Sequence, residues 1–337
     1  MTCRPSAATG HAIGPVAGAA IWIAICAAGV ADSADGTFES VYEPSGVTAL
    51  PDGTLVVLDD EAGTALHAMR IRQEGDRLSL VGQAPIDAPA AIARRWRLGR
   101  LDDLEGACHD AAGRALVIGS HNTDAGIDDT DRRKVVRFTL RSGRLHDVAL
   151  RRDLRQDLLE ALPAVRQAMR DGGKHDARLD IEALACDRRR DRLLIGLRSP
   201  REDERAMIVV LTNADAWFDD GADPQFERPV RTLELDKGGI RAMAYDATND
   251  ALLIVSRRES GKGGRFKAWW QDATLSRPPR QLRLPHKGAF DDVEGVTMLD
   301  DADAVLFVRD DGNRDKGRTG SWFHTTRTAL GLPGGTP

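Results

Sequence analysis

Three glutamates and one arginine recur at the same position of a repeated segment. Each stands fourteen residues before the end of a short apolar run: Glu105, Glu182, Arg241 and Glu294. A weaker fifth copy begins at Glu43-Pro44-Ser45-Gly46 and has Ser45 at that position. Equivalent positions of successive repeats face one another when the repeats close into a ring. The pattern therefore predicts a ring of carboxylates that contains one guanidinium, with Glu43 nearby.

Carboxylates that converge on one axis repel one another, because burial of like charges raises their pKa values and costs stability. A hard, oxygen-ligated ion such as Ca²⁺ or another divalent cation would relieve this repulsion. The predicted metal ligands are Glu43, Glu105, Glu182 and Glu294. Arg241 would neutralise part of the ring without a metal. A third interpretation, in which the charges only close a solvated channel through ion pairs, stays open.

A second set of polar residues follows the apolar runs of the repeats. These segments are Asp59-Asp60-Glu61, Ser120-His121-Asn122, Arg198-Ser199-Pro200, Arg257-Arg258 and Arg309-Asp310-Asp311. Packing alone does not require titratable residues at one place in every repeat. His121 suits proton transfer near neutral pH, and Arg198 and Arg241 suit the binding of an anionic group. These three are the predicted catalytic residues, and a surface imidazole without a role is the competing interpretation of His121.

The repeats predict the fold that must position these side chains. The five anchor residues Ser45, Glu105, Glu182, Arg241 and Glu294 lie at spacings of 60, 77, 59 and 53 residues. Repeats of roughly 40 to 60 residues, built from short β-branched runs and turn residues, are typical of a β-propeller. We expect an all-β propeller with five blades, and six as the alternative. The segment 36–42 is expected to complete the last blade.

The repeats also contain signals for turns and for one helix. Pro51-Asp52-Gly53 predicts a hairpin turn, and Asp110, Asp187 and Asp246 each stand five residues after an anchor, where an aspartate starts a turn. Residues 151–170 carry apolar side chains at helical spacing. This helix would be an insertion between the second and third repeats, with its apolar face on the propeller rim.

Residues 1–31 do not follow the repeat. Arg4 precedes an apolar stretch from Ala12 to Ala31 that ends in small residues, which is the pattern of an export signal peptide. A retained membrane anchor is the alternative, because the stretch approaches the roughly 20 residues that span a bilayer. Residues 36–327 are expected to form a single propeller domain, and 328–337 a flexible tail. The predicted location is periplasmic or secreted.

Composition narrows the range of partners. The chain has 47 basic and 52 acidic residues and a net charge of −5, which gives no general attraction to nucleic acid. It contains no nucleophile elbow, phosphate-binding loop, zinc-spaced Cys or His pairs, or dinucleotide fingerprint. We expect a monomer whose partner is a small anionic molecule or an envelope ligand. A membrane is a partner only if the N-terminal segment is retained.

Two cysteines remain after removal of the predicted signal. Cys108 follows its anchor by three residues, and Cys186 follows its anchor by four. Because side chains alternate between the faces of a strand, these unequal offsets place the two residues on opposite faces. The sequence therefore favours two buried thiols over a disulfide.

Several of these motifs together resemble those of a bacterial family of exported β-propeller proteins that is known only as a domain of unknown function. They are Glu43-Pro44-Ser45-Gly46, Asp103-Leu104-Glu105-Gly106, Gly119-Ser120-His121, Ile195-Gly196-Leu197-Arg198-Ser199-Pro200, Gly239-Ile240-Arg241 and Asp310-Asp311-Gly312. More distantly, the Glu-Gly repeat resembles phytase-like esterase propellers and the gluconolactonase and regucalcin propellers. The resemblance implies channel-facing carboxylates that bind calcium or another divalent ion, foremost Glu105 and Glu294. The chain departs from that pattern at Ala183, which follows Glu182, and at Arg241.

The leading functional hypothesis is a divalent-metal-dependent hydrolase of an ester, lactone or phosphoester. In it Glu105, Glu182 and Glu294 lie near the metal, His121 carries the proton, and Arg198 and Arg241 hold the anionic group. The alternative is a non-catalytic propeller that binds a ligand or a protein of the cell envelope, because a fold does not select a function.

Overall fold

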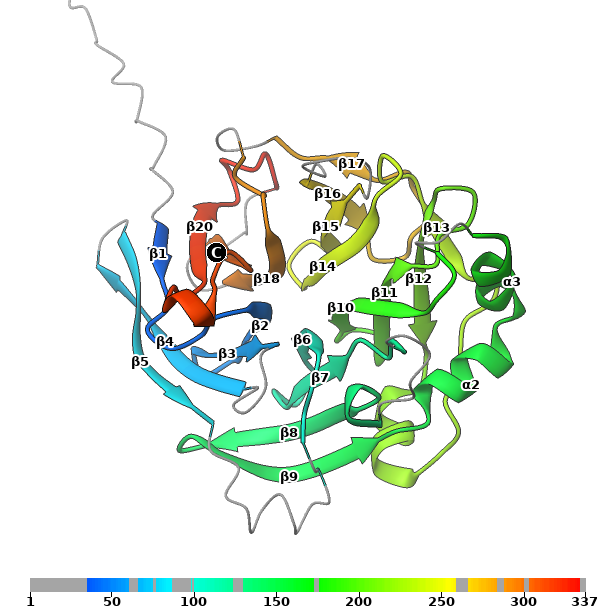
Figure 1. Ribbon diagram of the computed structural model, residues 1–337, viewed down its shortest axis with the longest axis horizontal. Coiled ribbons are helices and arrows are strands. Elements are labelled where there is room, and N and C mark those ends of the chain that lie inside the picture. The colour runs from blue at the N-terminus through cyan, green and yellow to red at the C-terminus, as the bar shows by residue number, and fades with distance from the viewer. Residues whose placement is uncertain are drawn as a thin grey trace, which may run out of the picture. The chain divides into compact units, whose positions relative to one another are not determined.

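The chain folds into a ring of five antiparallel sheets arranged around a common axis (Figure 1). The computed structural model describes residues 35–60, 66–74, 77–86, 98, 100–123, 130–172, 176–258, 266–283, 288–299 and 303–333. The predicted signal or anchor, residues 1–31, lies outside the described residues. Each sheet has four strands, so the prediction of a five-bladed propeller is confirmed.

The blades follow one another along the chain, and the first strand of each lies innermost. Blade 1 contains β2 (Pro44–Ala49), β3 (Thr54–Asp59), β4 (Leu66–Glu74) and β5 (Arg77–Pro85). Blade 2 contains β6 (Leu104–His109), β7 (Ala115–Gly119), β8 (Val135–Arg141) and β9 (Arg144–Arg151). Blade 3 contains β10 (Asp180–Asp187), β11 (Arg192–Ser199), β12 (Ala206–Leu211) and β13 (Arg231–Leu233). Blade 4 contains β14 (Gly239–Asp246), β15 (Ala251–Arg257), β16 (Phe266–Asp272) and β17 (Arg280–Gln281).

Blade 5 joins the two ends of the described chain. It contains β18 (Val293–Leu299), β19 (Ala304–Arg309), β20 (Ser321–Thr326) and, as its outer strand, β1 (Asp35–Thr37). Gly36 is opposite Trp322 in the β1–β20 pair. This pairing confirms that the N-terminal segment completes the last blade, and it covers the edge of β20, which would otherwise be open to other chains.

The hairpin turns form where the sequence predicts them. The Asp52 side chain accepts a hydrogen bond from the Thr54 amide at 2.9 Å, and Gly53 has the positive φ that this turn needs. Asp110, Asp187 and Asp246 each accept hydrogen bonds from backbone amides of the following turn. Their predicted structural role is therefore confirmed.

The insertion between blades 2 and 3 is helical, and its apolar face packs on the propeller rim as predicted. It forms two short helices, α2 (Leu154–Ala161) and α3 (Pro163–Asp171), at the right of Figure 1. The chain leaves the helical conformation at Leu162, because the ring of Pro163 disfavours that conformation in the residue before it. Leu154, Leu158 and Val165 are fully buried in the core shared by blades 2 and 3.

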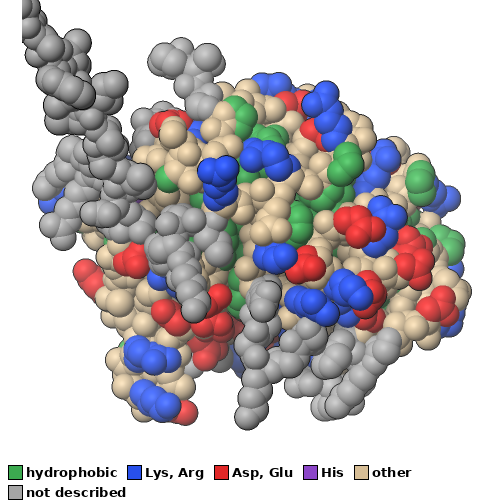
Figure 2. Space-filling model, turned by 90° about the horizontal axis from the view of Figure 1, so that it is seen from above, with side chains coloured by type: hydrophobic (Ala, Val, Ile, Leu, Met, Phe, Trp, Pro, Cys, Tyr) green, Lys and Arg blue, Asp and Glu red, His purple; other side chains and the backbone are tan. Residues whose placement is uncertain are grey.

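The core lies between neighbouring blades. Leu330 and Leu332 are buried in the cluster between blades 4 and 5, so packed residues continue beyond 327, where the domain was expected to end. Among the described residues, no helix has the length and hydropathy to cross a membrane. On the side of the molecule seen in Figure 2, acidic and basic side chains of the described residues are intermixed.

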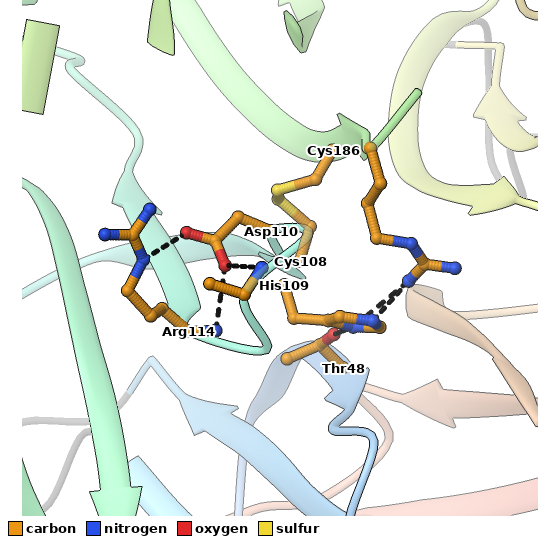
Figure 3. The surroundings of a disulfide bond; sticks show 8 residues. Thr48, Cys108, His109, Asp110, Arg114 and Cys186 are labelled. Atoms are coloured by element: carbon orange, nitrogen blue, oxygen red, sulfur yellow. Dashed lines mark hydrogen bonds and ion pairs between the residues drawn. A yellow bond between two sulfur atoms is a disulfide. The ribbon is translucent and has the colours of Figure 1, made fainter. Parts of the chain in front are cut away.

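Cys108 and Cys186 form a disulfide, which corrects the prediction of two thiols. The Cα atoms are 5.6 Å apart, and the bond links β6 of blade 2 to β10 of blade 3 (Figure 3). Adjacent blades of a propeller pack face to face. Residues that meet between them therefore come from opposite faces of equivalent strands. Cys108 and Cys186 can pair because they lie at different distances after their anchors and so point from opposite faces of the two strands. The prediction of two thiols was wrong because it treated the two strands as parts of one sheet.

Replacing both cysteines by alanine should lower the free energy of unfolding by about 2–4 kcal/mol, because the bond closes a long loop, with a sequence separation of 78, in the unfolded chain. Denaturant unfolding of the double variant and of the wild type, each with and without reductant, measures this loss. Reductant should bring the wild type close to the variant. A variant that unfolds within about 0.5 kcal/mol of the oxidised wild type would show that the bond does not stabilise the fold.

Candidate functional site: carboxylates at the channel mouth

All five anchor residues lie at the same irregularity of the inner strand. In every blade the pairing between the first two strands shifts at the anchor: Ser45, Glu105, Glu182, Arg241 and Glu294. A β-bulge leaves its extra residue unpaired and redirects the side chain. The bulges, which recur at one level of the ring, explain how residues of five separate sheets converge on the channel.

The glycine that follows several anchors permits this convergence. A Cβ atom on Gly106 would lie 2.7 Å from the Leu184 backbone nitrogen, and one on Gly295 would lie 2.9 Å from the Gly46 Cα. Neighbouring inner strands therefore approach more closely at this level than a side chain allows. The Glu-Gly pattern has a packing cause in addition to any chemical one.

Arg241 is the cation at the centre of the ring. Its Nη1 lies 3.0 Å from Glu182 Oε1, and its Nη2 donates to Glu294 Oε1. The arginine is only 5% exposed. Because it pairs with a glutamate of blade 3 and a glutamate of blade 5, one guanidinium neutralises carboxylates on both sides of its own blade. Glu182 also accepts from Arg198 Nη1 at 2.7 Å.

Glu105 has no such partner. The structure brings one oxygen each of Glu105, Glu182 and Glu294 within 4.8 Å of one another, and it does the same for Asp60, Asp103 and Glu105. Glu105 is 8% exposed. Within the described part of the chain, neither the Glu105 nor the Asp60 carboxylate forms a hydrogen bond or an ion pair. On this side of the ring the carboxyl groups of Glu105 and Asp60 therefore have no cationic partner among the described residues, whereas Asp103 has Arg132.

Burial and mutual repulsion raise the pKa values of these acids. Burial, with Asp103 and Glu43, raises the pKa of Asp60 to about 8. Burial and the nearby Glu182 raise the pKa of Glu105 well above its ordinary value. Burial raises the pKa of Glu182 to about 8, against the opposing effect of Arg241. A cation at this position would compete with protons that the acids otherwise retain.

The remaining predicted residues lie at the same mouth but in different roles. Burial and Asp59 raise the pKa of the partly exposed Glu43. Glu43 belongs to neither three-residue carboxylate group found in the described chain. Arg198 is 31% exposed and reaches Asp180 Oδ2 at 3.6 Å in addition to Glu182. It is the predicted arginine that lies closest to solvent.

His121 is fully buried, in contrast to the expected accessible proton carrier. Neither ring nitrogen has a hydrogen-bond partner among the described residues. Burial, together with Arg155 and Arg133, lowers its pKa to about 3. The imidazole is therefore neutral across the physiological range and does not accept protons readily at pH 7.

Asp60, Asp103 and Asp310 are site residues to which the predictions gave no metal-binding or catalytic role, although Asp60 and Asp310 belong to the second polar set of the sequence. Asp103 contacts Ser120 Oγ and lies 3.4 Å from Arg132 Nη1. Asp310 is exposed on one side, and partial desolvation of its carboxyl group together with Glu294 raises its pKa to about 7. A signal for them was present, because Asp60 and Asp310 follow the ends of second strands and Asp103 precedes the Glu105 anchor by two residues. In each blade the start of the first strand and the end of the second strand are neighbours in the hairpin. Considering the acidic residues at both of these positions together would have identified the three aspartates.

Comparisons with known proteins do not identify the chain. No protein-family model matches it, and no curated protein sequence matches it. A solved structure of Kuenenia stuttgartiensis hydrazine synthase is similar at 9% identity and a TM-score of 0.37, over 80% of this chain and 56% of that one. The tail fiber of Staphylococcus aureus phage P68 is similar at 12% identity and a TM-score of 0.42, over 87% and 52%. The hemopexin-fold protein CP4 from cow pea is similar at 8% identity and a TM-score of 0.39, over 72% and 92%.

The chain spans about half the length of the first two structures. Likenesses of this strength carry no argument about function. The resemblance to an exported propeller family of unknown function stays a prediction.

Replacing Arg241 with methionine should destabilise the protein by roughly 3 kcal/mol or more, because it leaves Glu182 and Glu294 as buried charges without their shared partner. Arg198→Met is the matched control, since Arg198 contacts the same glutamate but is more exposed, and it should cost less. Denaturant unfolding in a chelating buffer gives both values. Equal losses for the two variants would show that Arg241 has no special place in the ring.

The raised pKa of Asp60 predicts a pH dependence of stability. Its folded-state pKa of about 8 lies above the ordinary value of 3.8, so the folded protein retains a proton that the unfolded chain releases first. The stability that this proton confers is complete below pH 4 and is lost as the pH rises toward 8. In chelating buffer, the free energy of unfolding should fall over that range, and it should fall less steeply in Asp60→Asn. Parallel pH profiles for the two proteins would contradict the assignment.

Proposed function

We propose that this propeller binds a divalent cation, foremost Ca²⁺, at the channel mouth and hydrolyses an ester, lactone or phosphoester of a small anionic molecule there. One observation carries the proposal: Glu105 and Asp60 are carboxylates without a cationic partner among the described residues, beside two glutamates that share Arg241. A site with uncompensated buried acids is costly unless a cation completes it.

The donor atoms fit a hard cation. Asp60, Asp103 and Glu105 offer carboxylate oxygens within 4.8 Å of one another, and Ca²⁺ is bound by oxygen ligands, with water completing the shell. The second group, which includes Glu182 and Glu294, is already occupied by the Arg241 guanidinium. We therefore assign the cation to the Asp60–Asp103–Glu105 group. The predicted ligands Glu182 and Glu294 would act through Arg241.

A divalent cation in this position would polarise the substrate oxygen as a Lewis acid. The residues of the chain would perform the other tasks. Arg198, at the solvent side of the ring, would hold the anionic group of the substrate. Asp310, whose pKa is raised to about 7, is matched to proton transfer near neutral pH and replaces His121 in this role. Arg241 would neutralise Glu182 and Glu294 and so leave the oxygens of Asp60, Asp103 and Glu105 for the cation.

Export to the periplasm or the medium is part of the proposal. The Cys108–Cys186 disulfide supports it, because disulfides persist in oxidising compartments. An alternative function is ligand binding without catalysis. The burial of His121 favours this alternative, since it removes the predicted proton carrier from the channel mouth.

Calcium should raise the thermal midpoint of the wild type, because a ligand that binds only the native state stabilises it, by about 2.7 kcal/mol at a hundredfold excess over Kd. Glu105→Gln should lose most of this rise. Glu234→Gln, which changes an exposed glutamate, should keep it. Differential scanning calorimetry with Ca²⁺, Mn²⁺ or chelator measures the effect. Thermal midpoints that do not change with the cation in any of the three proteins would contradict the proposed metal site.

Catalysis is tested on the same proteins with panels of aryl esters, lactones and phosphoesters. The proposal expects turnover that requires the cation and is lost in Glu105→Gln. Cation binding without turnover on any panel would support the non-catalytic alternative.

A further inference from the structure

The channel has a second chemically distinct end. A cavity of about 520 Å³ lies where the inner strands finish, away from the anchors. Its lining comes from all five blades, through the last residues of β2, β6, β14 and β18 and the end of β10. This volume falls within the roughly 300–1,000 Å³ of small-molecule pockets. The acidic mouth and this cavity are at opposite ends of the same strands.

The lining combines apolar and polar side chains. Leu50, Ile71, Val296, Met298 and Leu299 contribute apolar surface. Polar groups come from Thr48, His109, Arg188, Tyr245 and Thr297. Pockets for small organic ligands have this composition, with much apolar surface and a few polar groups that fix the orientation of the ligand.

The cavity lining contains one acidic and one basic side chain. Of the lining residues, Asp110 and Arg188 are the charged ones at neutral pH. Asp110 is held away by Arg114, whose Nε lies 2.6 Å from Asp110 Oδ2, and it also caps the hairpin turn (Figure 3). Burial and Arg188 lower the pKa of His109 to about 4, so the imidazole adds no charge. The cationic group of the lining is therefore the Arg188 guanidinium.

Arg188 is held in position by neighbouring groups. Its Nη1 donates to His109 Nε2, and its guanidinium carbon lies 5.8 Å from the centre of the Tyr245 ring. An arginine only donates hydrogen bonds, so Nε2 accepts and the proton of the neutral imidazole is on Nδ1, 3.4 Å from Thr48 Oγ1. The chain Thr48–His109–Arg188 thus has a defined direction.

The disulfide fixes the two strands that carry this pair. Cys108, which pairs with Cys186, precedes His109 directly (Figure 3). In the sequence Cys186 lies two residues before Arg188. The covalent link between blades 2 and 3 therefore also sets the distance between the imidazole and the guanidinium. Such preorganisation lowers the entropic cost of binding.

We propose that this cavity is a second binding site, which takes a small organic carboxylate with an apolar body. The carboxylate would pair with Arg188 beside His109, because a planar guanidinium matches a carboxylate in geometry and charge. The apolar body would contact the apolar side chains of the lining, among them Leu50, Ile71 and Leu299. The site is independent of the cation site, since none of its lining residues belongs to the carboxylate groups at the other mouth.

Binding is tested by isothermal titration calorimetry of the full chain in chelating buffer, so that cations at the other mouth do not contribute. The probes are benzoate, its uncharged analogue benzamide, and acetate, which has the charge without the apolar body. We expect benzoate to bind roughly tenfold or more tightly than either of the others. Benzamide binding as tightly as benzoate would overturn the proposal.

Arg188→Met should weaken benzoate binding roughly tenfold or more. Arg141→Met is the matched control, because it removes an exposed arginine of β8 outside the cavity lining, and it should bind as the wild type does. Equal affinity of the Arg188→Met variant and the wild type would overturn the proposal.

The ring resonances of His109 provide a measurement that does not depend on the variant folding. In the wild type they should shift on titration with benzoate and not with benzamide. Unchanged His109 resonances at saturating benzoate would place the ligand elsewhere and contradict the assignment.

Discussion

The arrangement of the channel mouth depends on one shared ion pair, that of Arg241 with Glu182 and Glu294. Five bulges bring anchor residues together, and three of the five are glutamates. Without a cation among them, the repulsion between buried carboxylates would oppose closure of the ring. The guanidinium has the reach and the donors to bind a carboxylate on each side. It divides the ring into a neutralised half and a half that remains acidic.

A bound cation would stabilise the acidic half of the ring more than the half that is paired with Arg241. Glu105 and Asp60 lie close to Asp103, and burial keeps their pKa values high. If every carboxylate of the ring were paired with an arginine, a bound cation would bring little additional stabilisation. Because only blade 4 has an arginine at the anchor position, two of the three anchor glutamates are paired and Glu105 is left for the proposed cation.

The two ends of the channel differ because the inner strands carry different residues at their two ends. The anchors lie at the start of each strand, while His109 and Arg188 lie at or just after the end. The disulfide near that second end ties blade 2 to blade 3, next to the helical insertion that covers the same pair of blades. The fold therefore stabilises blades 2 and 3 in a way that it does not repeat elsewhere in the described chain.

Much of this architecture could be predicted from the repeat. The anchors fixed the blade number, the inner strands and the residues that meet in the channel, because equivalent positions of a closed ring must face one another. The sequence also predicted that the N-terminal segment completes the last blade, because this extended segment has no hairpin partner of its own. The break at Leu162 was visible in the sequence as Pro163 but was not used.

Other features depended on relations between blades that a single repeat does not contain. The disulfide joins residues on opposite faces of strands in adjacent sheets. The alternation of side chains along a strand was applied as if both cysteines lay in one sheet, and it therefore wrongly excluded the bond. Asp60 reaches Glu105 from the neighbouring blade, and this proximity follows from the twist and the bulges. His121 is buried, and its backbone contacts Arg132 and Arg155, which are distant in the sequence; the repeat pattern does not predict these contacts.

The central claim is that Arg241 leaves the Glu105 side of the ring as the place where a cation binds. Anomalous diffraction from crystals of the full chain grown with Mn²⁺ tests it most directly, because it locates the ion without reference to activity. The account predicts one anomalous peak in contact with Glu105 and Asp60, with Arg241 still paired to Glu182 and Glu294. A peak between Glu182 and Glu294 with Arg241 displaced, or no peak at the channel mouth at saturating Mn²⁺, would contradict it.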